Sequence, residues 1–167
     1  MTQAQHEHRL SIVRIIAAPT QRVFDAWIDP EHRKKWWAAE PGMTCDFAEI
    51  DARVGGRFRI NMKQRYHDGI HEWVCVGEFR LVDPPRKLVF TWSWEHEDAV
   101  VPGSAARDTL VTVEFRTVDG GTEVAVTHEQ FATDAIRADH EKGWNGCLES
   151  LANYLGGSSH AKASNSE

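Results

Sequence analysis

The sequence predicts an α+β protein in which a curved antiparallel sheet of about seven strands wraps around a long C-terminal helix, with two short helices after the first strand. Three observations lead to this prediction. Six consecutive segments alternate apolar and polar residues and are separated by turn sequences. A later segment carries apolar residues at three- and four-residue steps. The 167 residues are enough for one domain with its own core.

The N-terminal part predicts one strand followed by two helices. Residues 9–16 are rich in β-branched side chains, which favour a strand. Thr20 is a suitable N-cap for a helix that runs to about residue 28. Pro30 fits the first turn of a second short helix that ends near residue 37.

The next six segments predict strands of an antiparallel meander. They are residues 43–51, 57–63, 70–82, 87–95, 108–117 and 122–130. Gly55-Gly56, Asp68-Gly69 and Gly120-Gly121 stand between some of them, and such pairs favour hairpins because tight turns need positive φ angles.

The alternation also predicts one aromatic face of the sheet. Phe90, Trp92 and Trp94 share a face of one strand, and Phe79 and Leu81 are assigned to the same face of the strand before it. A helix that begins at residue 133 or 134 and reaches about residue 155 can cover this face. Its length of roughly 33 Å at ~1.5 Å per residue equals that of a ten-residue strand.

Composition and charge exclude several classes of protein. Nineteen Lys and Arg against 25 Asp and Glu give a net charge of −6 with no basic stripe, which excludes a phosphate-tracking nucleic-acid binder. No apolar run approaches the ~20 residues of a membrane span, and the first residues lack the apolar core of a signal peptide. Cys45, Cys75 and Cys147 show no paired spacing, so we expect reduced thiols and a cytoplasmic protein.

Several short motifs occur in a fixed order along residues 8–156, which we expect to form a single domain between flexible tails at 1–7 and 157–167. The motifs are Ala17-Ala18-Pro19, Val23-Phe24-Asp25-Ala26-Trp27, Asp29-Pro30, Trp36-Trp37, Arg53-Val54-Gly55-Gly56-Arg57-Phe58, Asp83-Pro84-Pro85-Arg86-Lys87-Leu88 and Gly143-Trp144-Asn145-Gly146-Cys147-Leu148, followed by Leu151. With this order of elements the chain resembles the helix-grip fold of the SRPBCC superfamily, which includes START and pollen-allergen-like proteins. Within the superfamily it is most similar to the AHSA-like branch, named after the activator of Hsp-90 ATPase homologue.

The resemblance implies a ligand cavity between the sheet and the long helix. We therefore expect the protein to bind a small hydrophobic or aromatic molecule there, without a cofactor and without catalysis. The expected ligand-binding residues face inward from the strands and the helices. They are Trp36, Trp37, Phe58, Ile60, Trp73, Phe79, Phe90, Trp92, Val113, Phe115, His128, His140, Trp144 and Leu148.

Three alternatives remain open. An enzyme of the cyclase or dehydratase type would use the same cavity, with His128 or His140 as its polar group, although a buried histidine is more often a satisfied core residue than a base. A chaperone-associated binding module, which the branch name implies, would use a surface. A homodimer would use an exposed strip at Val74 and Val76 or the loop at residues 94–102.

We expect neither a metal site nor a covalent nucleophile. His67 and His71 are four residues apart, but Asp68-Gly69 between them predicts a hairpin turn and not a helix. Cys75 and Cys147 fall at inward positions and are expected to be inert.

Overall fold

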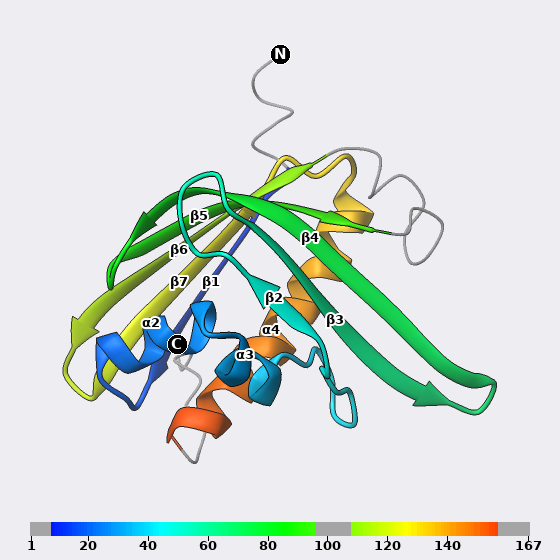
Figure 1. The fold of residues 1–167 in the computed structure, drawn as a ribbon, viewed down its shortest axis with the longest axis horizontal. Coiled ribbons are helices and arrows are strands. Elements are labelled where there is room, and N and C mark those ends of the chain that lie inside the picture. The colour runs from blue at the N-terminus through cyan, green and yellow to red at the C-terminus, as the bar shows by residue number, and fades with distance from the viewer. Residues whose placement is uncertain (1–7, 96–107, 157–167) are drawn as a thin grey trace.

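The computed structural model describes residues 8–95 and 108–156. Its seven strands form one curved antiparallel sheet in the order β1-β7-β6-β5-β4-β3-β2 (Figure 1). The strands are β1 Leu10–Ile16, β2 Ala48–Ile50, β3 Arg57–Tyr66, β4 Gly69–Asp83, β5 Lys87–Trp94, β6 Thr109–Val118 and β7 Gly121–Glu129. The β3–β4 hairpin extends well beyond the helices.

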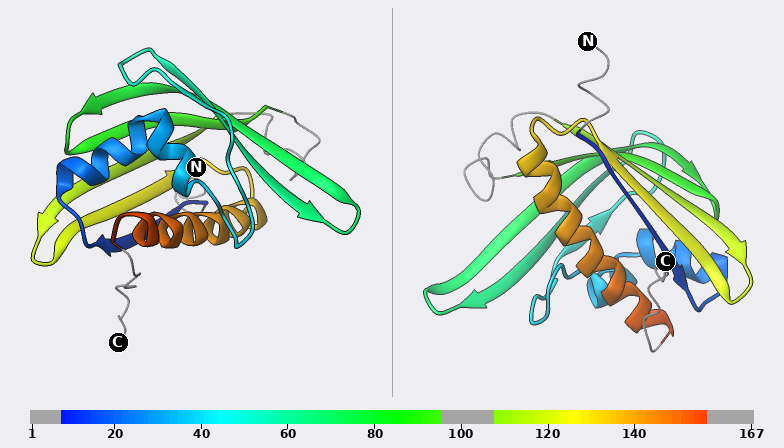
Figure 2. Two further views of the ribbon diagram at one scale, coloured as in Figure 1. Left: turned by 60° about the horizontal axis from the view of Figure 1, so that its bottom comes forward. Right: turned by 180° about the vertical axis from the view of Figure 1, so that it is seen from behind.

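Three helices lie on the concave side of this sheet (Figure 2). Helix α2 spans Thr20–Ile28, α3 spans Pro30–Trp36, and α4 spans Asp134–Gly156. The side chain of Asp29 accepts a hydrogen bond from the N–H of Glu31, with Pro30 in the first turn of α3. The Thr133 hydroxyl accepts from the N–H of Ile136 and caps α4. The α+β fold expected from the sequence is therefore confirmed. Among the described residues, no helix is both long and apolar enough to cross a membrane.

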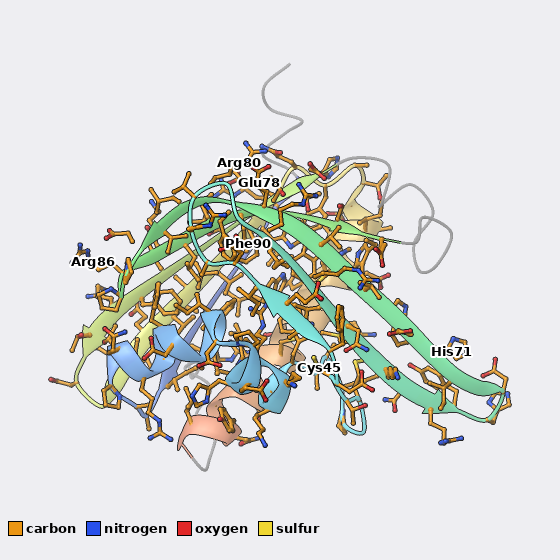
Figure 3. The ribbon with its side chains drawn as sticks, in the orientation of Figure 1. Cys45, His71, Glu78, Arg80, Arg86 and Phe90 are labelled. Atoms are coloured by element: carbon orange, nitrogen blue, oxygen red, sulfur yellow. The ribbon has the colours of Figure 1, made fainter. Side chains whose placement is uncertain are left out.

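The concave side is tightly packed at one end. Phe24 and Trp27 from α2 contact the Phe115 ring of β6, with ring centroids 5.2 and 6.0 Å apart. Phe58, Phe79 and Phe90 form a cluster with centroids 5.3–5.8 Å apart. Phe90 lies beneath the sheet in Figure 3, whereas Glu78 and Arg80 lie at its outer surface. Aromatic side chains therefore fill this end of the core.

Strand β2 is shorter than the predicted segment of residues 43–51. An isolated bridge pairs Thr44 with Lys63 before the three-residue strand begins at Ala48. Between these points the backbone N–H groups of Asp46 and Phe47 donate to the side-chain oxygen of Asn61, both at 3.1 Å. The backbone N–H of Asn61 still donates to the carbonyl oxygen of Phe47 at 3.1 Å, so backbone and side-chain hydrogen bonds alternate in this stretch and no regular strand forms.

Three further expectations were wrong. The pairing of β4 with β5 shifts register between Phe79 and Leu81, so Leu81 leaves the inner face and is 38% exposed. Val74, expected on an exposed strip, is 3% exposed, while Val76 is half-buried. Thr20 does not cap α2: its hydroxyl bonds to those of Thr117 and Thr122, at 2.6 and 3.1 Å. The expected tails and residues 96–102 of the expected contact loop lie outside the described residues.

Candidate functional site

A cavity of about 190 Å³ lies at the end of the concave side opposite the phenylalanine cluster. Tryptophan, methionine and small residues from the sheet, α4 and the segment after α3 form most of its walls. The lining residues are Trp37, Ala39, Met43, Met62, Trp73, Trp92, Trp94, Asp139, His140, Gly143, Trp144 and Cys147. Asp139 is exposed and marks the rim, whereas Trp92, Trp144 and Cys147 are buried at the inner part of the lining.

The segment that follows α3 forms one wall because it packs directly on α4. Gly146 of α4 approaches this segment so closely that a Cβ on it would lie 1.8 Å from the carbonyl oxygen of Ala39. Trp37, at the end of α3, contacts both Trp92 and Trp144, with ring centroids 5.8 and 5.6 Å apart. The backbone contact at Gly146 therefore positions Ala39 and Trp37 at the cavity.

Two histidines beside the cavity each belong to a separate hydrogen-bonded group that includes a tryptophan side chain. The Trp144 indole N–H donates to Nδ1 of His128 at 3.0 Å, and Nε2 of His128 lies 2.7 Å from the Thr109 hydroxyl. Thr109 donates in turn to the carbonyl oxygen of Trp92 at 3.0 Å. Because an indole N–H can only donate, His128 is neutral with its proton on Nε2.

His140 is held in the opposite tautomer. Its Nδ1 lies 2.8 Å from the carbonyl oxygen of Ile136, and its Nε2 accepts from the Trp94 indole N–H at 3.0 Å. Burial lowers the pKa of His128 well below its ordinary value, and burial also lowers the pKa of His140. Each neutral ring has its lone pair engaged by an indole N–H, so both histidines orient tryptophans and neither offers a free base to the cavity.

The structure brings together five of the fourteen expected site residues. Trp37, Trp73, Trp92, His140 and Trp144 line the cavity. The other nine lie in the packed core around it. They are Trp36, Phe58, Ile60, Phe79, Phe90, Val113, Phe115, His128 and Leu148. The alternation of inward residues identifies the core face of a strand, but it does not say which part of that face remains uncovered.

Seven lining residues were not expected at the site. Met62 and Trp94 share the inward alternation of their strands, and Gly143 and Cys147 lie on the same side of α4 as Trp144, so the periodic patterns contained a signal for these four. Asp139 precedes His140 at the rim. Ala39 and Met43 lie in an irregular segment, which no periodicity predicts.

The cysteines and the remaining histidines form no second site among residues 8–95 and 108–156. No group of three metal-ligating side chains occurs there. Burial raises the pKa of the Cys75 thiol to about 12 and also raises that of Cys147. His71 lies near the far end of the β3–β4 hairpin (Figure 3) and pairs with Asp68.

Comparison with solved structures shows that this architecture is shared. A crystal structure of a protein from Mycobacterium smegmatis superposes with a TM-score of 0.73 at 22% identity, covering 93% of this chain and 95% of that one. The AHSA1 protein from Silicibacter pomeroyi gives 0.73 at 23% identity, with 88% and 96% covered. The AHSA1-like protein from Aeromonas hydrophila gives 0.68 at 28% identity, with 88% and 91% covered.

The family comparison defines the relationship more closely than the structural similarity does. A comparison with curated proteins gave no significant match. The family model described as activator of Hsp90 ATPase homolog 1-like protein matches residues 17–156, which include every helix and all strands except β1. The chain therefore belongs to the activator of Hsp90 ATPase homolog 1-like family, within the SRPBCC superfamily.

Proposed function

We propose that the protein binds a small, mainly aromatic molecule in the cavity between α4 and the sheet, without transforming it. The observation that carries this proposal is the lining of the cavity: five tryptophans surround a volume of about 190 Å³, and apart from the indole N–H groups the polar side chains among the described lining residues are those of Asp139 and His140. An apolar cavity of roughly 150 Å³ accommodates benzene, so this volume suits a ligand with one or two rings.

Binding fits this site better than catalysis. A cyclase or dehydratase needs a group that can take up a proton within reach of its substrate. The lone pair of His140 is engaged by Trp94, and that of His128 by Trp144. The apolar lining favours a ligand through removal of aromatic surface from water, at roughly 25 cal/mol per Å².

Titration with 2-naphthol tests the proposal. We expect one molecule to bind per chain, with a dissociation constant of about 10 µM to 1 mM, measured by isothermal calorimetry and by a change in tryptophan emission. Gly143→Phe should abolish binding, because a Cβ at Gly143 would meet only the Cβ of Ala39, at 3.8 Å, and the larger side chain can enter the cavity.

Gly143→Ala is the matched control, since it adds one carbon atom and should leave most of the affinity. Binding that persists in a folded Gly143→Phe variant, or that saturates only at many molecules per chain, would exclude the cavity. A partner-binding surface, as the Hsp90-related name of the family suggests for its relatives, would then be the next hypothesis.

A further inference from the structure

The side chain of Arg33 lies inside the protein and is not part of the lining of the proposed ligand cavity. The residue is 4% exposed, and its guanidinium carbon lies 4.2 Å from the ring centroid of Trp37 and 5.1–5.3 Å from those of Trp36 and Trp27. Nη1 donates to the carbonyl oxygen of Trp27 at 2.7 Å. The Nε–H is buried and has no acceptor.

No carboxylate balances this charge among the residues described. The ionisable groups that act on Arg33 are the thiols of Cys75, Cys147 and Cys45. Burial raises the pKa of each thiol, so all three are neutral near pH 7. Burial also lowers the pKa of Arg33, to about 10, which leaves the guanidinium charged at pH 7. A buried charge of this kind requires a counter-charge or several hydrogen bonds.

Arg33 lines a void of about 10 Å³, close to the space that one water molecule needs. Trp27 also lines it, and the indole Nε1–H of Trp27 is a second buried donor without an acceptor. The remaining lining side chains, including Phe58, Phe79 and Phe90, are apolar. The polar atoms that the lining side chains offer are therefore N–H donors, and no side-chain oxygen or nitrogen among them is an acceptor.

A buried positive charge beside a void that offers only N–H donors favours an anion over a water molecule in that void. A water molecule could accept from Arg33 and Trp27, but its own two hydrogens would find no acceptor among these side chains. A monatomic anion has no hydrogens to place, and it compensates the guanidinium charge. We propose that Arg33 and Trp27 bind one halide ion, chloride under ordinary conditions, beside the phenylalanine cluster.

The halide site does not depend on ligand binding in the larger cavity. Thermal unfolding in different sodium salts tests the halide site. Sodium chloride or bromide is exchanged for sodium gluconate, whose anion is too large for the void, at constant ionic strength. We expect the melting temperature to rise with halide concentration and to saturate, by about 3–5 °C at 150 mM if the dissociation constant is about 10 mM.

Arg33→Met keeps the length of the side chain but removes the charge, and it should abolish the halide response. Arg86→Met is the matched control, because Arg86 is exposed and pairs with Asp83 at 3.0 Å at the outer edge of the molecule (Figure 3). The control should respond like the original protein. Equal melting temperatures in chloride and gluconate, or a halide response retained in Arg33→Met, would overturn the proposal.

The ³⁵Cl linewidth of the unaltered protein provides a second test, which does not require the variant to fold. We expect the protein to broaden the chloride signal, and bromide to reverse that broadening by competition. A linewidth that matches the protein-free buffer would contradict the site.

Discussion

The indole N–H groups of Trp94 and Trp144 each donate a hydrogen bond to a histidine nitrogen. These hydrogen bonds explain why two imidazole rings are tolerated in an aromatic core. A buried imidazole without partners would be costly, whereas both nitrogens of His128 and of His140 have a partner within 3.0 Å. The inward alternation of residues 124–128 predicts a buried His128. It could not predict the Trp144 donor, which comes from a different element.

Substitution of Trp144 separates packing from hydrogen bonding. Trp144→Ala should lower the free energy of unfolding by roughly 3–5 kcal/mol, because it removes a large buried ring. Trp144→Phe keeps most of the apolar contact but leaves Nδ1 of His128 without a donor, so we expect a smaller loss of about 1–3 kcal/mol. Urea unfolding measures both values. An unchanged midpoint for Trp144→Ala would contradict the packing of α4 on the sheet.

The two histidines also predict a dependence of stability on pH. Their pKa values are lowered in the folded protein, so the unfolded chain binds more protons below its own histidine pKa of ~6.5. Their contribution is complete above about pH 6.5 and is lost as the pH falls, by up to about 1.4 kcal/mol per pH unit for each ring.

Urea unfolding at pH 7.5, 6.5 and 5.5 measures this loss, and NMR titration identifies the residues responsible. The imidazole resonances of His128 should stay unchanged down to pH 5.5. Equal stability at pH 6.5 and 5.5, or a normal titration of His128, would show that these hydrogen bonds do not hold the neutral form.

At the level of the elements, local patterns predicted most of the fold. The two short helices, the six strands after them and the long helix follow from turn residues and periodicity, and α4 ends at Gly156, one residue beyond the expected boundary. The errors arise where a contact distant in sequence overrides the local pattern. The Asn61 side chain binds the backbone N–H groups of Asp46 and Phe47 before β2 begins, and the register shift after Phe79 turns Leu81 outward. Neither the Asn61 contact nor the register shift leaves a periodic signal in the sequence.

Two glycines of α4 provide a matched pair that tests the contact with the segment after α3. Gly146→Ala would place a carbon 1.8 Å from the carbonyl oxygen of Ala39, so we expect a loss of about 1–3 kcal/mol or more. Gly143→Ala meets ordinary contact at 3.8 Å and should gain roughly 0.5–1 kcal/mol from helix propensity. Thermal unfolding compares the stability of the two variants with that of the original protein. Equal effects of both substitutions would mean that the segment after α3 does not pack on α4 at Gly146.

Across the whole molecule, the concave side has a filled end and a hollow end. Helices α2 and α3 supply Phe24, Trp27 and Trp36 to the filled end, where the remaining void of about 10 Å³ lies beside Arg33. The hollow end lies beneath β5 at Trp92 and Trp94 and against α4 near Trp144. The sequence predicts which residues face inward but not this division, because the division depends on where α2, α3 and the segment after α3 pack against the sheet.

This division predicts opposite effects for two residues on the inner face of one strand. Phe79 lies in the phenylalanine cluster and is 3% exposed, so Phe79→Ala should lower the free energy of unfolding by roughly 3–5 kcal/mol and leave 2-naphthol affinity within about twofold. Trp73 is half-buried beside the cavity, so Trp73→Ala should cost only about 1–2 kcal/mol. Loss of one stacking partner should weaken 2-naphthol binding about 3- to 10-fold. Urea unfolding measures the stability of both variants, and calorimetry measures their affinity for 2-naphthol. If Trp73→Ala is the more destabilising and leaves the affinity unchanged, the hollow end is structural core and not a binding site.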